Sequence, residues 1–407
     1  MKSLLILTPR FPYPVIGGDR LRIYQLCRAL AGRYRLTLLS LCDTPEEMAM
    51  ALPDDGVFHR VERVFLPKWR SWLNTTLALP SRTPLQVAYY RHAGFRRRAL
   101  ALMAEHDGTL AHLIRVGDVI KDAPGVKFLE MTDAISLNYE RIRSTRGSKS
   151  DLRARIYSLE VDRLRTYEEA IVDRFDHSFL VSDIDRRHLF ADQPGKLSRV
   201  SVFSNGVALD AMPYQFDARG RDIVFIGNMF SLQNFDAALY MAADVLPLVR
   251  KVRPEARLRL IGRIQPDQAA QLNAFDGVDV TGEVPDVVVA ARGGAVGVCP
   301  LRLGAGVQNK VLEYMALGLP TVSTTMGLEG FHASHGRDLL VADGTESLAA
   351  AVVRLLDDRA LAEAMARSAR HYVESTHSWS AMLAPMMQLI DARLDAGPTS
   401  GQESVTA

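Results

Sequence analysis

The order of apolar and glycine-containing segments limits most strongly what this chain can fold into. A short apolar run at 4–7 precedes a loop with Gly17 and Gly18, apolar residues at helical spacing over 21–30, and a second apolar run at 36–41. This order of strand, loop, helix and strand predicts a βαβ unit, in which the two strands are parallel.

The same order of segments returns after residue 220. An apolar run at 223–226 ends at Gly227, and a helical pattern follows it. Because the whole chain has 407 residues, it is long enough for two such domains. We therefore predict an α/β fold with two successive Rossmann-like domains, each built on a parallel sheet. The later strands of the second domain are expected at 258–261, 278–280, 296–299 and 321–323.

A turn signal at 204–207 follows a strand candidate and separates the two patterns. The end of the chain contains an amphipathic helical pattern and then small and polar residues that favour disorder. The predicted parts are an N-terminal domain at 1–205, a C-terminal domain at 206–378, a helix at 379–395 that packs back toward the first domain, and a disordered tail at 396–407.

The charge also divides the chain into two unlike halves. Residues 1–205 carry 32 Lys and Arg against 24 Asp and Glu, a net charge of +8, whereas the remaining residues carry a net charge of −6. The small overall charge of +2 therefore conceals a basic and an acidic half. A nucleic-acid-binding protein is disfavoured, because no RNA-binding motif is present and the isoelectric point near 8.4 is below the range typical of such domains.

The basic character is most evident at 68–98, where tryptophans and leucines alternate with arginines. Such a stretch suits the interface of a membrane with anionic headgroups, or a face that receives an anionic, lipid-linked ligand. The alternative is a helical connection whose apolar residues pack on their own domain while the arginines are solvated.

The three cysteines, Cys27, Cys42 and Cys299, are scattered and form no CxxC pair, which favours a reducing compartment. The apolar run at 4–8 is too short for a signal peptide, and no uncharged apolar stretch approaches the roughly 18 residues that span a bilayer. We therefore expect a cytoplasmic protein that can lie at the inner face of the membrane. No metal and no cofactor are predicted, since no His/carboxylate cluster stands at a strand end.

The clearest site pattern lies at 304–320, where a glycine-containing loop after a predicted strand leads into a helix. Gly304 and Gly306 let the backbone approach a ligand closely, and the amides at a helix N-terminus favour an anion. Lys310 and Glu313 are three residues apart and share one helical face. A cation for a diphosphate beside a carboxylate for ribose hydroxyls indicates a nucleotide-diphosphate site. The alternative is a glycine-rich turn with an ordinary surface Lys–Glu pair.

The spacing of this segment resembles the donor-site signature of family-4 retaining glycosyltransferases of the GT-B fold. The subgroup of bacterial exopolysaccharide sugar transferases is the most similar, and weaker similarity extends over residues 1–390. The matching positions of the signature are Gly306, Lys310, Glu313, Ala316, Gly318, Pro320 and Val322. Further elements that match in order are Gly17-Gly18, Val181-Ser182, the stretch 204–207, Gly227 with Asn228, and Gly262 with Arg263.

The resemblance implies two domains that face each other across a cleft, with the acceptor on the N-terminal side and the nucleotide sugar on the C-terminal side. Glu313 matches the glutamate that binds the ribose hydroxyls, and Lys310 is expected to neutralise the departing diphosphate. The remaining donor-site residues that it implies are Gly17, Gly18, Gly227, Arg263, Gly304, Ala305, Gly306 and Val307.

The sequence departs from the family pattern at two places. Ala305 stands where the family has a second glutamate, and the neutral Asn228 and Gln233 stand where it has cations that clamp the pyrophosphate. Lys310 and Arg263 are then the expected substitutes.

Candidate residues of the first domain are less sharply marked. His112 follows a predicted strand and matches a family histidine near the donor sugar, while Asp133 ends the next strand. The alternatives are a packed histidine and a helix cap, respectively. Arg20 and Arg22, after the glycine loop, are further candidate cations for the diphosphate.

The resemblance therefore implies a metal-independent hexosyltransferase that moves a sugar, with retention, from a nucleotide-diphosphate sugar to a saccharide or lipid-linked saccharide acceptor. The implied role is exopolysaccharide or surface-glycan synthesis. A nucleotide-sugar epimerase of the same fold and a non-catalytic nucleotide-sugar-binding relative are the alternatives. An NAD-dependent oxidoreductase is disfavoured, because no GxGxxG follows the first strand.

Overall fold

The computed structural model of the chain describes residues 1–15, 18–145, 152–303 and 307–397. It divides into two compact units. The first comprises Met1–Ser204 together with Met382–Ala407, and the second comprises Asn205–Ala381.

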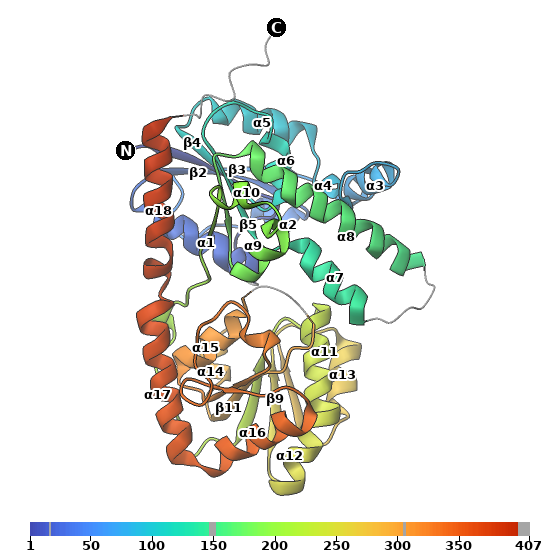
Figure 1. The fold of residues 1–407 in the computed structure, drawn as a ribbon, viewed down its shortest axis with the longest axis vertical. Helices are drawn as coiled ribbons and strands as arrows, with labels where there is room; N and C mark the ends of the chain where they lie inside the picture. Colours follow the sequence, from blue (N-terminus) through green and yellow to red (C-terminus); the bar gives the residue numbers. More distant parts are fainter. Residues whose placement is uncertain (16–17, 146–151, 304–306, 398–407) are drawn as a thin grey trace. The chain divides into compact units, whose positions relative to one another are not determined.

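The first unit is built on a sheet of seven strands in the order β3-β2-β1-β4-β5-β6-β7 (Figure 1). Every neighbouring pair is parallel. The strands are β1 (Ser3–Thr8), β2 (Arg35–Cys42), β3 (Arg60–Phe65), β4 (Gly108–His112), β5 (Lys127–Thr132), β6 (His177–Leu180) and β7 (Val200–Val202).

Helices surround this sheet, and the end of the chain returns to it. Lys2 pairs with Asp395, and Arg33 Nη1 lies 2.6 Å from the Asp391 carboxylate, so α18 packs beside the strand β1 and the helix α1 (Figure 1). The helices are α1 (Gly18–Ala31), α2 (Pro45–Ala49), α3 (Lys68–Ala78), α4 (Leu85–Tyr89), α5 (Ala93–Met103), α6 (Ile114–Ile120), α7 (Ile135–Thr145), α8 (Leu152–Ile171), α9 (Asp183–Phe190), α10 (Pro194–Leu197) and α18 (Trp379–Ala396).

The strand order of the first sheet reverses at β1, which has β2 on one side and β4 on the other. In open parallel sheets, ligands bind outside the carboxyl ends of the strands at such a reversal. The loop after β1 and the carboxyl ends of β4 and β5 therefore form the edge at which a site is expected.

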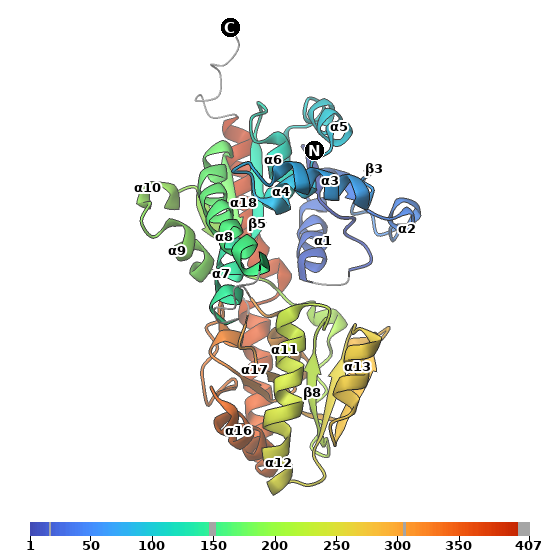
Figure 2. The same cartoon turned by 90° about the vertical axis from the view of Figure 1, so that its right-hand side faces the viewer.

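The second unit has a sheet of six strands in the order β10-β9-β8-β11-β12-β13, again parallel throughout. Figure 2 presents α11, α12 and β8 of this unit to the viewer. The strands are β8 (Asp222–Ile226), β9 (Arg257–Ile261), β10 (Val278–Gly282), β11 (Gly294–Cys299), β12 (Thr321–Ser323) and β13 (Leu340–Val341). The helices are α11 (Leu232–Tyr240), α12 (Leu246–Val252), α13 (Pro266–Asn273), α14 (Val287–Ala290), α15 (Asn309–Leu317), α16 (Thr345–Asp357) and α17 (Arg359–Thr376).

Both faces of β8 are covered, as its uninterrupted apolar sequence requires. Ile223 and Phe225 pack with residues of α11, α12 and α16, whereas Val224 and Ile226 pack with residues of α14 and α15. Each face therefore has its own apolar cluster, and together the two clusters hold helices on both sides of the sheet.

The helix α15 is fixed to the sheet by the buried phenol of Tyr314. Its hydroxyl accepts a hydrogen bond from the Ile226 amide at 2.7 Å and donates to the Val298 carbonyl at 3.2 Å. A Cβ on Gly297 would lie 2.6 Å from the Tyr314 ring, so glycine is needed there for the helix to approach. This packing sets where the N-terminus of α15 lies relative to the ends of β8 and β11.

The two parallel sheets with helices confirm the predicted α/β fold of two Rossmann-like units. The predicted helix of the glycine-loop segment begins at Asn309, after the loop. Among the residues described, no helix has both the length and the apolar character needed to cross a membrane.

Candidate functional site

The N-terminus of α15 holds Lys310 with its ammonium group buried. Lys310 Nζ donates to Asn234 Oδ1 at 2.9 Å and to Gln308 Oε1 at 3.3 Å, and it lies 5.4 Å from the centre of the Phe225 ring. Burial lowers the pKa of Lys310, while the nearby Cys299 and Glu313 oppose that shift. The amide oxygens thus hold a cation beneath the first turn of the helix.

Glu313 lies one turn further along α15 and is partly exposed. Burial raises the pKa of its carboxyl, and the charge of Lys310 acts in the opposite direction. Within the described ranges, no hydrogen bond or ion pair engages this carboxylate. Its oxygens are therefore placed to accept hydrogen bonds from the hydroxyls of a ligand.

The first amides of α15 have no side-chain cap: Gln308 at the N-cap position makes no capping hydrogen bond. Uncapped amides at a helix N-terminus attract anions, because several N–H groups and the helix dipole point the same way. Lys310 and these amides therefore create a positive end on α15, with an acidic group one turn behind it.

Two glycines bring the ends of β8 and β9 together next to this helix. The Gly227 amide donates to the Ile261 carbonyl at 2.9 Å. Gly262 has φ +133°, and a Cβ there would lie 2.1 Å from the Gly227 carbonyl oxygen. Only glycine permits this contact, which places Arg263 directly beside the Gly227 loop.

Arg263 is half-exposed, with its guanidinium 5.2 Å from the Phe230 ring centre and 3.4 Å from the Glu283 carboxylate. The neutral Asn228 and Gln233 leave this loop without the cations of the family pattern. Asn234, which was not predicted from the sequence, connects the two parts of the site. It accepts from Lys310 and donates through Nδ2 to the Asn228 carbonyl at 3.0 Å.

Four predicted donor-site residues lie outside the described residues, namely Gly17, Gly304, Ala305 and Gly306. Val307 is partly buried just before α15, and Gly18 is the first residue of α1. The structure thus brings Gly227, Arg263, Val307, Lys310 and Glu313 to one edge of the second unit, while Gly18 belongs to the first.

In the first unit, the predicted residue His112 is part of a buried charged array. His112 is 2% exposed, and its Nδ1 lies 3.0 Å from Glu130 Oε2. The other oxygen of Glu130 accepts from Arg22 Nε at 2.7 Å, and Thr132 Oγ1 donates to Oε2 at 2.8 Å. Despite burial, Arg22 and His112 lower the pKa of Glu130 to about 2, so Glu130 is a carboxylate.

Arg22 therefore differs from its expected role as a cation for the diphosphate, because its guanidinium is buried against Glu130. Arg20 likewise pairs with Glu47 at 2.5 Å. Glu130 was not predicted from the sequence. A lone glutamate within the apolar strand β5 was the available signal, since a buried carboxylate needs a partner.

Asp133 follows the end of β5 and is partly buried. Burial, reinforced by the negative charges of Asp185 and Glu130, raises the pKa of Asp133 to about 8. Asp133 does not act as the alternative helix cap, because the backbone amides at the start of α7 donate their hydrogen bonds to Glu168 and Asp185 instead. The carboxyl of Asp133 accepts a long contact of 3.5 Å from Asn138.

Asp19 completes the acidic groups of this edge, and its pKa is held below the usual range by Arg10 and His112 although burial opposes this. Glu130 and Asp133 have opposite protonation preferences, a pattern typical of sites that use one carboxylate and one carboxylic acid. Across the described part of the chain, no cluster of three or more His, Cys, Asp or Glu residues is arranged to hold a metal ion.

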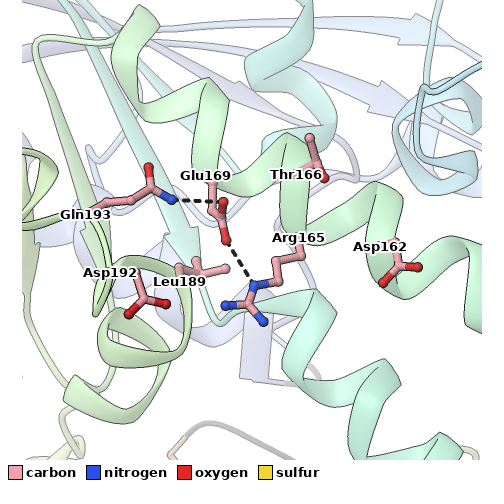
Figure 3. Close-up of a pocket in the computed structure, with 7 residues that line it drawn as sticks. All are labelled: Asp162, Arg165, Thr166, Glu169, Leu189, Asp192 and Gln193. Carbon is pink, nitrogen blue, oxygen red and sulfur yellow. Dashed lines mark hydrogen bonds and ion pairs between the residues drawn. The ribbon is translucent and has the colours of Figure 1, made fainter.

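A polar hollow on the first unit is lined mainly by residues of α8 and of the end of α9 (Figure 3). Glu169 is held there by Arg165 at 3.0 Å and by Gln193 at 2.9 Å. None of the predicted site residues lines it. The lining residues are Asp162, Arg165, Thr166, Glu169, Leu189, Asp192 and Gln193.

Comparison with known proteins finds a family model that matches part of the chain and a relative of low identity. Residues 220–358 match the family model described as "Glycosyl transferases group 1". An uncharacterized 44.6 kDa protein in the cps region of Klebsiella pneumoniae is 24% identical over 368 residues, covering 84% of this chain and 88% of that protein.

Solved structures show the same fold over nearly the whole chain. Sucrose-phosphate synthase from Thermosynechococcus elongatus superposes with a TM-score of 0.74 at 16% identity, covering 97% of this chain and 100% of that one. Anabaena HepE, in complex with UDP-glucose, superposes with a TM-score of 0.66 at 11% identity, covering 96% and 100%.

The fold is therefore GT-B, the architecture of a large class of glycosyltransferases. The residues matched by the family model, 220–358, lie within the second unit and include the N-terminus of α15.

Proposed function

We propose that this chain transfers a hexose from a nucleotide-diphosphate sugar to a saccharide or lipid-linked saccharide, with retention and without a metal or other cofactor. The observation that carries the proposal is the N-terminus of α15, where Lys310 is buried beneath uncapped amides and the Glu313 carboxylate lies one turn behind. The UDP-glucose complex of HepE supports a nucleotide sugar as donor, and the cps region of the Klebsiella relative supports exopolysaccharide or surface-glycan synthesis.

In this proposal, the leaving diphosphate is the group that the second unit stabilises. The first amides of α15 and the side chains of Lys310 and Arg263 oppose the negative charge that develops as the glycosidic bond to the diphosphate breaks. Glu313 orients the nucleotide by accepting hydrogen bonds from the two ribose hydroxyls, which are stronger than neutral ones because the acceptor is charged.

The first unit supplies the groups that meet the sugar or the acceptor hydroxyl. His112 presents an imidazole nitrogen, and Asp133 presents a carboxyl with a pKa of about 8. A group with such a pKa exchanges protons readily at neutral pH, as acid–base catalysis of sugar transfer needs.

Incubation of the purified chain with a panel of nucleotide sugars, with and without a bacterial membrane lipid extract, tests the proposal. We expect release of the free nucleoside diphosphate together with a glycosylated product, in chelator as well as in its absence. An altered sugar without nucleotide release would indicate an epimerase. Binding without turnover would indicate a non-catalytic relative, an outcome that the neutral Asn228 and Gln233 make worth testing.

We further propose that α3 places the chain on anionic membranes. Its tryptophans Trp69 and Trp72 are 68% and 65% exposed, and Leu77 is 69% exposed. Lys68 and Arg70 lie on the same helix. Exposed aromatic and leucine side chains beside basic groups are typical of interfacial helices, and anionic headgroups add to the binding.

Replacing Trp69 and Trp72 together by serine is expected to weaken binding to phosphatidylglycerol vesicles roughly 10- to 100-fold, since two large apolar side chains no longer enter the interface. Vesicle co-sedimentation measures this. The matched control is Val252→Ser with Val289→Ser, which removes exposed apolar groups of the second unit. Equal binding of the tryptophan variant and the wild type would contradict the proposal.

A further inference from the structure

His112 has one nitrogen in a hydrogen bond and one without a partner. Nδ1 contacts Glu130, whereas Nε2 is buried and makes no hydrogen bond to any residue that the structure describes. Thr8 Oγ1, at the end of β1, is likewise buried and makes no hydrogen bond to a described residue. Leu7 is paired in register with Ala111, so Thr8 and His112 lie side by side at the carboxyl edge of adjacent strands. Two buried polar atoms without protein partners at one edge indicate a ligand or water there.

The backbone is strained next to His112 and close to Glu130. Leu113, directly after His112, has φ +69°, and Thr132, two residues after Glu130, has φ +66°. Residues other than glycine adopt such angles only at an energetic cost, and such residues cluster at functional sites. Both residues also hydrogen-bond to Glu130. The Leu113 amide donates to the Glu130 carbonyl at 2.7 Å, and Thr132 Oγ1 donates to the Glu130 carboxylate.

We propose that Glu130 is a positioning residue that fixes the tautomer of His112, so that Nε2 accepts a hydrogen bond from a substrate hydroxyl. This inference rests on the proposed sugar transfer. A carboxylate can only accept hydrogen bonds, so the proton of a neutral imidazole must lie on Nδ1 where it faces Glu130. Nε2 then carries the lone pair. The low pKa of Glu130, about 2, keeps the carboxylate charged at any pH at which the protein works.

Arg22 determines which terminal atom of the side chain at position 130 faces His112. The Arg22 guanidinium contains only N–H donors, and it donates to Glu130 Oε1. The side-chain atom of residue 130 that faces Arg22 must therefore be an oxygen. In Glu130→Gln the amide oxygen is therefore retained by Arg22, and the amide nitrogen turns toward His112. That nitrogen donates to Nδ1, which forces the imidazole proton onto Nε2. The single substitution thus changes the exposed nitrogen from an acceptor to a donor with almost no change of shape.

The first readout is the tautomer itself, measured from long-range 1H–15N spectra of the full chain with 15N-labelled histidine, with the His112 signals assigned from a His112→Asn spectrum. We expect the Nδ1–H tautomer in the wild type and the Nε2–H tautomer in Glu130→Gln. An Nε2–H tautomer in the wild type would overturn the inference, and this result does not depend on whether the variant folds.

The second readout is turnover. We expect kcat/KM of Glu130→Gln to fall by about 100-fold or more, as a wrong histidine tautomer does in other enzymes, while the affinity for the nucleoside diphosphate stays within about twofold because the second unit is untouched. Glu130→Asp, which keeps the charge, should recover part of the loss together with the Nδ1–H tautomer. The matched control is Glu160→Gln, a buried carboxylate that pairs with Arg163 and makes no hydrogen bond to a histidine among the described residues.

Unchanged turnover of Glu130→Gln alongside a switched tautomer would overturn the inference. A wild-type chain that turns over no nucleotide sugar would instead contradict the proposed function, and the part of the inference that concerns Glu130 and the tautomer would then be decided by the spectra.

Discussion

Replacing Glu313 by glutamine is expected to weaken binding of the nucleotide on the order of 100-fold. The substitution keeps the shape of the side chain but removes the charge, and hydrogen bonds from two ribose hydroxyls to a carboxylate contribute about 1.5–3 kcal/mol each, more than bonds to a neutral amide. Because this contact is made before and during the reaction, KM for the donor should rise at least as much as kcat falls.

Isothermal titration with nucleoside diphosphates measures the affinity, and steady-state kinetics measure KM. Glu255→Gln, an exposed glutamate of the same unit, is the matched control and should behave as the wild type. Unchanged affinity of Glu313→Gln would mean that the nucleotide lies elsewhere, however the transfer rate responds.

Replacing Asp133 by asparagine is expected to raise stability and lower activity at the same time. A carboxyl whose pKa is raised in the folded state stabilises the fold only while it is protonated. Its contribution is complete below its unfolded pKa near 3.9 and is lost as the pH rises through about 8. Asparagine is neutral throughout, so the variant avoids the cost of ionising a partly buried acid.

The gain in the free energy of unfolding of Asp133→Asn over the wild type should therefore be larger at about pH 8.5 than at about pH 5.5, by on the order of 1–3 kcal/mol. This is less than the full pKa shift would give, because water reaches part of the side chain. At both pH values, the turnover of Asp133→Asn should be at least about 100-fold below that of the wild type if Asp133 exchanges a proton with substrate. Urea denaturation at both pH values measures the first effect. The exposed Asp54 supplies the control Asp54→Asn. A variant that is less stable at high pH than at low pH, relative to the wild type, would show that Asp133 is ionised in the fold.

The fold was predictable because central strands such as β1 and β8 are short apolar runs that end at a polar residue or are followed by a glycine. The spacing of Lys310 and Glu313 likewise predicts that both lie on one helix, and both lie on α15. The first domain was harder, because its charged residues meet only through the tertiary fold. Glu130 pairs with His112 across 18 positions and with Arg22 across 108, and no local pattern relates them.

Arg22 shows most clearly what the sequence lacks. Its place after the glycine loop favoured a diphosphate ligand, whereas its burial against Glu130 decides that it is part of the core. Asn234 is the opposite case: a neutral residue that organises the site, since it holds Lys310 through one atom of its amide and the Asn228 carbonyl through the other.

The central claim is that the N-terminus of α15 binds the diphosphate of a nucleotide sugar. A crystal structure of the wild-type chain with a bound nucleoside diphosphate sugar tests it most directly. We predict density for the diphosphate at the first amides of α15 near Lys310, with the ribose hydroxyls on the Glu313 carboxylate. Density for the nucleotide at another place, such as the hollow lined by Arg165 and Glu169, with the end of α15 empty, would contradict the account.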